Sequence, residues 1–134
     1  MIIKDAVMVT IVNEECLILS MSGMIDTMTL LELAQDMNRI EADKFYIKRL
    51  VYVKDVLGVS LKCEDVMYYR TIRPEPEIVI KSALCAFNDF QYGMARMFQA
   101  VMESDKRIME IFKDIESAAQ WLNVDADLLR NKSV

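Results

Sequence analysis

Two side chains that lie close together in the sequence, Ser60 and Cys63, have the chemistry of a modification site or a nucleophile. We expect Ser60 to cap a helix that runs from Leu61 to about Arg70, which places Cys63 in the first helical turn. A helix N-terminus attracts anions and can make a thiol more reactive. Phosphorylation of Ser60 or reaction of Cys63 is therefore one interpretation. A helix cap beside an unreactive, semi-buried thiol is the other.

A second group, Tyr92, Gly93 and Arg96, falls on another predicted helix, which Asn88 caps and Gln91 completes as a capping box. Glycine inside a helix costs about 1 kcal/mol relative to alanine. We therefore expect close packing of the helix backbone at Gly93, on a strand or on a partner; room for a ligand beside Tyr92 is the alternative. Arg96 either binds an acidic or anionic group or stays solvated.

The chain has no histidine, which removes the commonest general base and the commonest nitrogen ligand of metals. Ser-His and Cys-His nucleophile pairs are thereby excluded. Cys16, Cys63 and Cys85 are too far apart in the sequence to indicate a disulfide framework or a zinc site. We predict a non-catalytic protein without metal or cofactor; an enzyme that uses Cys63 or paired carboxylates is the alternative.

The segment 54–59 follows a short apolar run and is predicted to form a loop. Ligands of open α/β sheets bind beyond the carboxyl ends of the strands, so Asp55 is a candidate for lining a crevice there. A solvated loop charge is the other interpretation. Our candidate partner or regulatory surface comprises Asp55, Gly58, Ser60, Cys63, Tyr92 and Arg96.

The length of 134 residues, 54% of them hydrophobic, fits one domain. We place that domain at residues 1–122 and expect a frayed or short helical tail at 123–134. The formal net charge of −5 without long basic runs argues against nucleic acid as a partner. No apolar stretch approaches the ~18 residues of a membrane helix, and the N-terminus does not resemble a signal peptide, which predicts a cytoplasmic protein without stable membrane insertion.

Apolar runs predict five strands, and apolar stripes at helical spacing predict four helices. Strands 6–12 and 16–21 are close enough to form an antiparallel hairpin, and Gly23 ends the second. A helix separates each later strand from the next, which favours parallel pairing. The predicted order is β-β-α-β-α-β-α-β-α, an α/β protein with a mixed, mostly parallel sheet. The remaining predicted elements are helix 29–42, strand 50–53, helix 61–70, strand 78–86, a helix after Asn88, strand 108–112 and helix 115–122.

Three segments of this pattern resemble one bacterial family. They are the glycine-and-acid turn 22–27, the helix 88–98 with its Tyr-Gly pair and following arginine, and the closing strand and helix 107–122. The element order is similar to the STAS domain of anti-anti-sigma factors, and the chain more closely resembles the SpoIIAA-like proteins. The resemblance implies a STAS-like fold and a protein partner or a second copy of the chain, as in a homodimer.

STAS switch proteins carry an Asp-Ser pair followed by a glycine at the start of the second helix, and the serine of that pair is phosphorylated. The matching stretch 59–65 has no such pair, so the resemblance does not carry that switch to Ser60. SpoIIAA-like proteins are also compared with a lipid-binding fold, and the eleven methionines indicate a plastic binding surface. Two functions follow as hypotheses: a regulatory or scaffolding module, or a carrier that holds an apolar or amphipathic ligand in a cavity of at least several hundred cubic ångströms.

Overall fold

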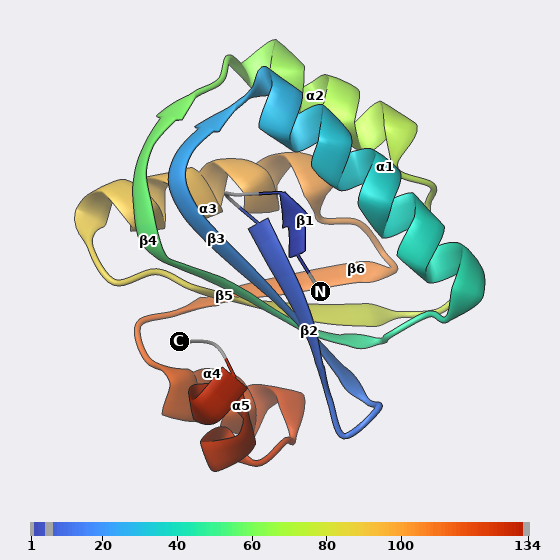
Figure 1. The fold of residues 1–134 in the computed structure, drawn as a ribbon, viewed down its shortest axis with the longest axis vertical. Helices are drawn as coiled ribbons and strands as arrows, with labels where there is room; N and C mark the ends of the chain where they lie inside the picture. The colour runs from blue at the N-terminus through green and yellow to red at the C-terminus, as the bar shows by residue number, and fades with distance from the viewer. Residues whose placement is uncertain (1, 5–6, 133–134) are drawn as a thin grey trace.

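The structure is a computed structural model that describes residues 2–4 and 7–132. A six-stranded sheet in the order β1-β2-β3-β4-β5-β6 carries helices on both faces (Figure 1). The elements are β1 (Ile2–Lys4), β2 (Val7–Val12), β3 (Cys16–Asp26), α1 (Thr27–Asp43), β4 (Lys48–Ser60), α2 (Cys63–Ile72), β5 (Ile80–Cys85), α3 (Asp89–Met102), β6 (Arg107–Phe112), α4 (Ile115–Leu122) and α5 (Ala126–Lys132).

The predicted hairpin and the predicted parallel strands are both confirmed. β2 and β3 pair antiparallel, and β3 to β6 pair in parallel. Asn13 and Glu14, with φ of 52° and 57°, form the turn of the hairpin, which Glu15 N–H closes by donating to Val12 O at 3.1 Å. Two positive φ values define a type I′ turn, whose twist matches that of the flanking strands. β1, which was not predicted, adds one further antiparallel strand.

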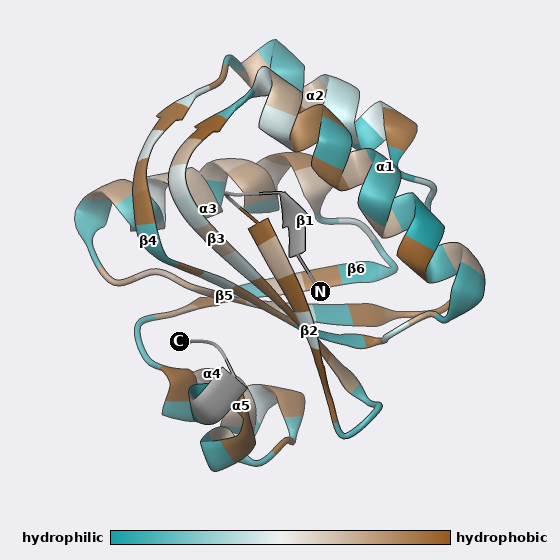
Figure 2. Cartoon of the chain, viewed as in Figure 1, coloured by the Kyte–Doolittle hydropathy of each residue, from teal (hydrophilic) through white to brown (hydrophobic). Residues whose placement is uncertain are grey.

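Alternation along the strands sorts the side chains into two cores, one on each face of the sheet. Leu17, Leu19 and Met21 of β3 pack beneath α1, α2 and α3. Cys16 and Ile18 face the opposite way, toward α4 and α5. Figure 2 shows the hydrophobic stretches along the strands that supply both cores.

β3 and β4 are both longer than predicted. Gly23 does not end β3: it adopts φ +70° at an irregularity in the pairing with β4, and the strand continues to Asp26. The predicted loop 54–59 is the second half of β4, which pairs with β3 as far as Ser60. The local sequence, with its charges and Gly58, favours a turn, but the parallel ladder overrides that preference.

The start of α2 also differs from the prediction, because β4 runs through Ser60. Ser60 ends a strand and caps no helix; the cap is Lys62, whose N–H donates to Asp65 Oδ2 at 2.8 Å. Cys63 does lie in the first turn of α2, as expected. The predicted cap at Asn88 is confirmed, and Asp26 and Asp114 cap α1 and α4 in the same way: each of the three accepts a hydrogen bond from the backbone three residues later.

The C-terminal segment packs on the sheet after α4. Asn123 adopts φ 57° and ends α4 in a left-handed cap. The chain then forms α5, whose Leu129 is fully buried in the core beneath α4. β5 is shorter than the predicted strand 78–86, and Ile78 and Val79 are exposed ahead of it.

Candidate functional site

The six residues of the predicted surface fall into two groups in the structure. Asp55, Gly58, Ser60 and Cys63 follow one another along the end of β4 and the start of α2. Tyr92 and Arg96 lie on α3, where both side chains are exposed, and Arg96 donates to Gln99 Oε1 at 3.3 Å. All six lie outside the cavity that the structure contains.

The expected close packing at Gly93 is wrong within this chain. A Cβ placed on Gly93 would meet nothing within 4 Å. Phe90, about one turn earlier in α3, is 48% exposed. This side of α3 therefore faces outward, and nothing in the fold requires glycine there.

Gln91 fixes the position of α3 on the sheet. Its side chain is only 1% exposed. Its Oε1 accepts from Phe87 N–H at 2.9 Å, and its Nε2 donates to Lys54 O of β4 at 2.9 Å. The predicted capping box is thus formed with one difference: the Gln91 side chain accepts its hydrogen bond from Phe87 N–H, one residue before the cap Asn88, and not from Asn88 itself. The second bond ties α3 to β4 and holds one wall of the cavity.

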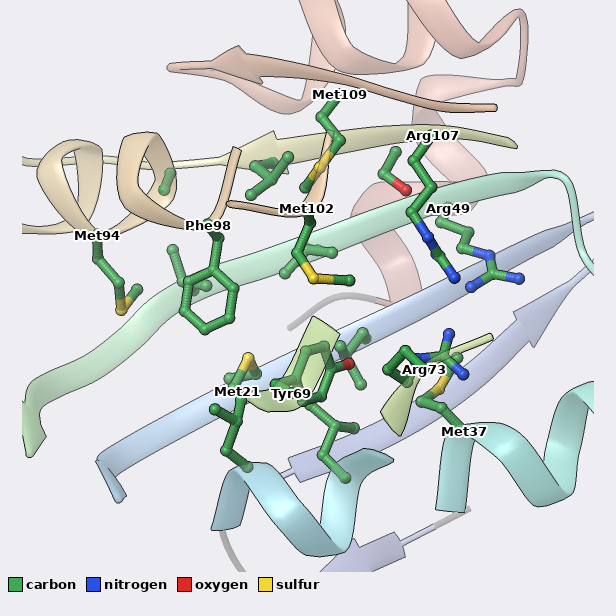
Figure 3. A pocket seen from close by; sticks show the side chains of 18 of the residues that line it. Met21, Met37, Arg49, Tyr69, Arg73, Met94, Phe98, Met102, Arg107 and Met109 are labelled. Atoms are coloured by element: carbon green, nitrogen blue, oxygen red, sulfur yellow. The ribbon is translucent and has the colours of Figure 1, made fainter. Parts of the chain in front are cut away.

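A cavity of about 120 Å³ lies between the sheet and helices α1, α2 and α3 (Figure 3). Its walls are mostly apolar, and α3 contributes Met94, Phe98 and Met102. Thioether side chains are flexible and polarizable, so they adapt to the shape of an apolar guest. The methionines of the wall are Met21, Met37, Met94, Met102 and Met109.

Three arginines lie together at one end of this cavity (Figure 3). Arg49 comes from the start of β4, Arg73 follows α2, and Arg107 begins β6. The sheet register explains why Arg49 and Arg107 lie close together. Arg49 pairs with Ser82 of β5, and Arg107 lies two residues before Met109, the β6 partner of Ser82. The charged end therefore lies at the amino ends of the strands, away from Asp55.

Glu41 of α1 holds two of the arginines. Arg73 forms a two-point pair with it, at 2.6 Å from Nη1 to Oε1 and 2.9 Å from Nη2 to Oε2. Arg49 Nη2 lies 2.5 Å from Glu41 Oε2, and its Nε donates to Tyr46 O at 2.9 Å. Arg73 also donates to Asn38 Oδ1 at 2.6 Å. Arg49, Arg73 and Glu41 are nearly enclosed, so the cluster is fixed in place.

The charges of this cluster shift one another's titration. Burial opposes the ionised form of Glu41, but hydrogen bonds from Arg73 and the charges of both arginines outweigh it and lower the pKa of Glu41. Burial, together with repulsion from Arg73 and Arg107, lowers the pKa of Arg49 despite the attraction of Glu41. Arginine stays protonated under all ordinary conditions, so the cluster remains cationic.

Arg107 is the arginine of the cluster without an ion pair among the described residues. Its Nη2 donates to Pro74 O at 2.6 Å. Burial and repulsion from Arg73 lower the pKa of Arg107, while Glu41 and Glu75 act in the opposite direction. Glu41 thus pairs with two of the three guanidinium groups, and no carboxylate of the described residues lies within ion-pairing distance of Arg107.

Sequence reasoning missed this cluster. Arg49, Arg73 and Arg107 each sit beside an apolar run or a proline and look like ordinary boundary charges. A signal was nevertheless present: Arg49 and Arg107 stand at the starts of two predicted strands, and parallel strands bring their starts to the same edge of a sheet. Arg73 and Glu41 carry no comparable local signal, since only the packing of α1 against α2 joins them.

The three thiols differ in exposure, and Cys63 is not the semi-buried thiol of our second interpretation. Cys16 and Cys85 are buried in the core. Burial raises the pKa of each to about 12, helped by Glu15 at Cys16 and by Asp114 at Cys85. Cys63 is exposed. Among residues 2–4 and 7–132, no three or more acidic, cysteine or histidine side chains gather as metal ligands, and no helix is long and apolar enough to cross a membrane.

The order of the strands and the helices on both faces define an α/β protein with a SpoIIAA-like fold, as expected from the sequence. One similar solved structure is that of an uncharacterized protein from the DUF3478 family with a SpoIIAA-like fold, from Shewanella loihica PV-4. The match has a TM-score of 0.52 and 16% sequence identity, and it covers 87% of this chain and 92% of that chain. Comparisons with protein-family models and with curated proteins find no match.

Proposed function

We propose that the chain is a non-catalytic binding protein that holds a small apolar or amphipathic molecule in the cavity beneath α1, α2 and α3. The observation that carries this proposal is the methionine-lined space of about 120 Å³ with its cationic end. Ligand sites of proteins have this composition: apolar walls with a few polar groups that fix orientation.

The volume limits the size of the ligand. An apolar cavity of roughly 150 Å³ binds benzene. The space of about 120 Å³ is therefore suited to one ring or a short alkyl chain. It is below the several hundred cubic ångströms that we expected of a lipid carrier, so we narrow the proposal to small ligands. The methionines of the wall supply some adjustment in shape.

The side chains around the cavity support binding over catalysis. The chain has no histidine, and the arginines at the polar end are poor proton donors at neutral pH because their pKa values are so high. The exposed thiol of Cys63 lies outside the cavity. A nucleophile paired with a base is the usual requirement for covalent catalysis, and the cavity wall supplies none.

The test is a titration of the protein, labelled with ¹³C at the methionine methyl groups, with benzyl alcohol. We expect saturable shifts of Met94 and Met102 in the cavity wall. Met67, exposed on α2 outside the cavity, is the internal control and should not move. Absence of shifts at the wall methionines, or equal shifts at Met67, would contradict the proposal.

A second candidate function is association with a protein, including another copy of this chain. It rests on the projecting ends of β3 and β4. β5 pairs with β4 only up to Tyr52, and β2 pairs with β3 only up to Met21, so both strands continue beyond their neighbours. Leu57 is 81% exposed on this projection, and Met24 beside Gly58 is exposed as well. Strand edges with apolar side chains favour association.

Sedimentation velocity tests this second function. We propose a homodimer through the projection, which Leu57→Asp should dissociate. Ile78→Asp, at an exposed apolar residue ahead of β5, is the matched control and should leave the assembly intact. A wild-type protein that stays monomeric at high concentration would exclude self-association. With either function we propose a cytoplasmic location, where thiols stay reduced.

A further inference from the structure

We infer that the cavity selects ligands that carry an anionic group, held by Arg73 and Arg107 while the apolar part of the ligand lies among the methionines. The inference rests on the proposed function and names its ligand class. That class is a small organic acid, with a carboxylate or a phosphate attached to one ring or to a short alkyl chain.

The charge balance at the end of the cavity supports an anion. Glu41 compensates Arg73 and Arg49 through ion pairs at 2.6 Å and 2.5 Å. Arg107 has no ion pair among the described residues, and the nearby Glu75 accepts a hydrogen bond from Ser104 Oγ at 2.6 Å. Arg107 is half-buried, and an excess of positive charge that is partly removed from water is unfavourable unless a counter-charge meets it. An anionic ligand beside Arg107 would provide that charge.

The N–H donors of Arg73 and Arg107 also support an anionic ligand. Arg73 is 5% exposed, and its Nε has no hydrogen-bond partner among the described residues, although the side chain of Tyr69 lies near it. A guanidinium offers five N–H donors in a planar fork that matches carboxylate and phosphate oxygens. Arg107 uses Nη2 for Pro74 O. Donors on two arginines are thus placed at the wall of one cavity.

The fixed geometry of the arginine cluster favours specific binding of a ligand. The two-point pair with Glu41 and the bond to Asn38 hold Arg73 in one orientation, so little side-chain entropy is lost when a ligand binds. The polar end and the methionine wall belong to the same cavity, so a single ligand can use both. Amphipathic anions fit this combination better than neutral molecules or free inorganic anions.

Calorimetric titrations with four probes test the inference: benzoate, phenyl phosphate, benzyl alcohol and inorganic phosphate. The ring is common to the first three, and the charge is absent from benzyl alcohol. Charge-assisted hydrogen bonds should make benzoate or phenyl phosphate bind about ten- to a hundredfold tighter than benzyl alcohol. The better of those two probes identifies the anionic group. Inorganic phosphate should bind more weakly than either, because it gains nothing from the apolar wall.

Two variants locate the effect. Arg107→Gln should remove most of the preference for the charged probe, measured as the ratio of its affinity to that of benzyl alcohol for the same variant. Arg96→Gln, at an exposed arginine of α3 outside the cavity, should change neither affinity. The wild-type probe series stands by itself if Arg107→Gln does not fold.

The outcomes separate the inference from the proposed function. Equal affinity for benzoate, phenyl phosphate and benzyl alcohol would overturn the inference and leave the proposed function standing. Inorganic phosphate that binds as tightly as phenyl phosphate would also overturn it, since the apolar wall would then contribute nothing. If none of the ring-bearing probes binds, the proposed function fails as well.

Discussion

Arg73 and Glu41 form a two-point ion pair, at 2.6 Å and 2.9 Å, although 32 positions separate them in the sequence. The pair joins the residue after α2 to the last turns of α1, and it is almost enclosed. A charge pair in such surroundings contributes less through attraction than it would cost if one partner were removed. Glu41 is therefore the residue on which the whole arginine cluster depends.

Glu41→Gln should destabilise the fold by about 3 kcal/mol, because it leaves Arg49 and Arg73 enclosed without a counter-charge. Chemical denaturation measures the change in the free energy of unfolding. The matched control is Glu116→Gln, which breaks the solvent-exposed pair between Glu116 and Arg130 and should have a much smaller effect. Equal effects of the two variants would show that the enclosed cluster has no special cost.

Because of Glu41, we also expect the free energy of unfolding to fall at acidic pH. Because the folded-state pKa of Glu41 lies below its ordinary value, folding is favoured while Glu41 is ionised in both states. This contribution is complete above the ordinary pKa of glutamate and is lost as the pH falls through the lowered folded-state pKa. Denaturation curves at several acidic pH values should show the loss in the wild type and a flatter profile in Glu41→Gln. Identical profiles would contradict this assignment.

Two glycines form a matched pair for testing backbone effects, because a Cβ at either Gly23 or Gly93 would meet nothing within 4 Å. Gly93 is helical, so Gly93→Ala should stabilise the protein by about 0.5–1 kcal/mol. Gly23 has φ +70°, so Gly23→Ala should destabilise it by about 1–2 kcal/mol. Thermal or chemical unfolding measures both. If Gly93→Ala destabilised the protein, α3 would have to pack closely at Gly93 against something other than the residues of a single chain.

Gln91→Ala should destabilise the protein by about 2 kcal/mol, because Phe87 N–H and Lys54 O both lose their partner. The link between α3 and β4 is lost with them, so hydrogen exchange of the α3 amides should accelerate more than that of α4. Gln120→Ala, at an exposed position of α4, serves as the control. Unchanged exchange in α3 would show that the side-chain bonds do not hold the helix.

Thiol reagents should distinguish the three cysteines. Native protein at neutral pH should be labelled at Cys63 alone, since Cys16 and Cys85 are buried and burial raises their pKa to about 12. Mass spectrometry counts the labels. Cys63→Ser should abolish native labelling, and denaturant should expose the other two thiols. Rapid native labelling of Cys16 or Cys85 would indicate that one of the cores opens.

Much of the fold follows from local patterns. The hairpin, the alternating helices and strands, and the caps at Asp26, Asn88 and Asp114 were predictable because capping and apolar periodicity act over a few residues. The predictions were wrong where contacts between segments distant in the sequence determine the secondary structure. Residues 54–59 carry charges and a glycine that favour a turn, yet pairing with β3 makes them strand. Ser60 lost its predicted role as a helix cap for the same reason.

The candidate site was harder to predict from the sequence than the fold. The predicted surface was chosen from residues with reactive side chains, whereas the cavity is built from methionines and arginines that are individually unremarkable. Met94 lies both in the core and in the cavity wall. Glu41 and Arg73 meet only because α1 and α2 pack together over the sheet. No spacing rule along the chain encodes that meeting.

The methionine wall makes the cavity vulnerable to oxidants. Conversion of a thioether to a sulfoxide adds a strongly polar oxygen, and that oxygen would find few hydrogen-bond donors on the apolar side of the cavity. Met109 is only partly buried, so peroxide can reach part of the wall without prior unfolding. Oxidative damage would thus remove binding before it removed the fold, and methionine sulfoxide reductases would restore it.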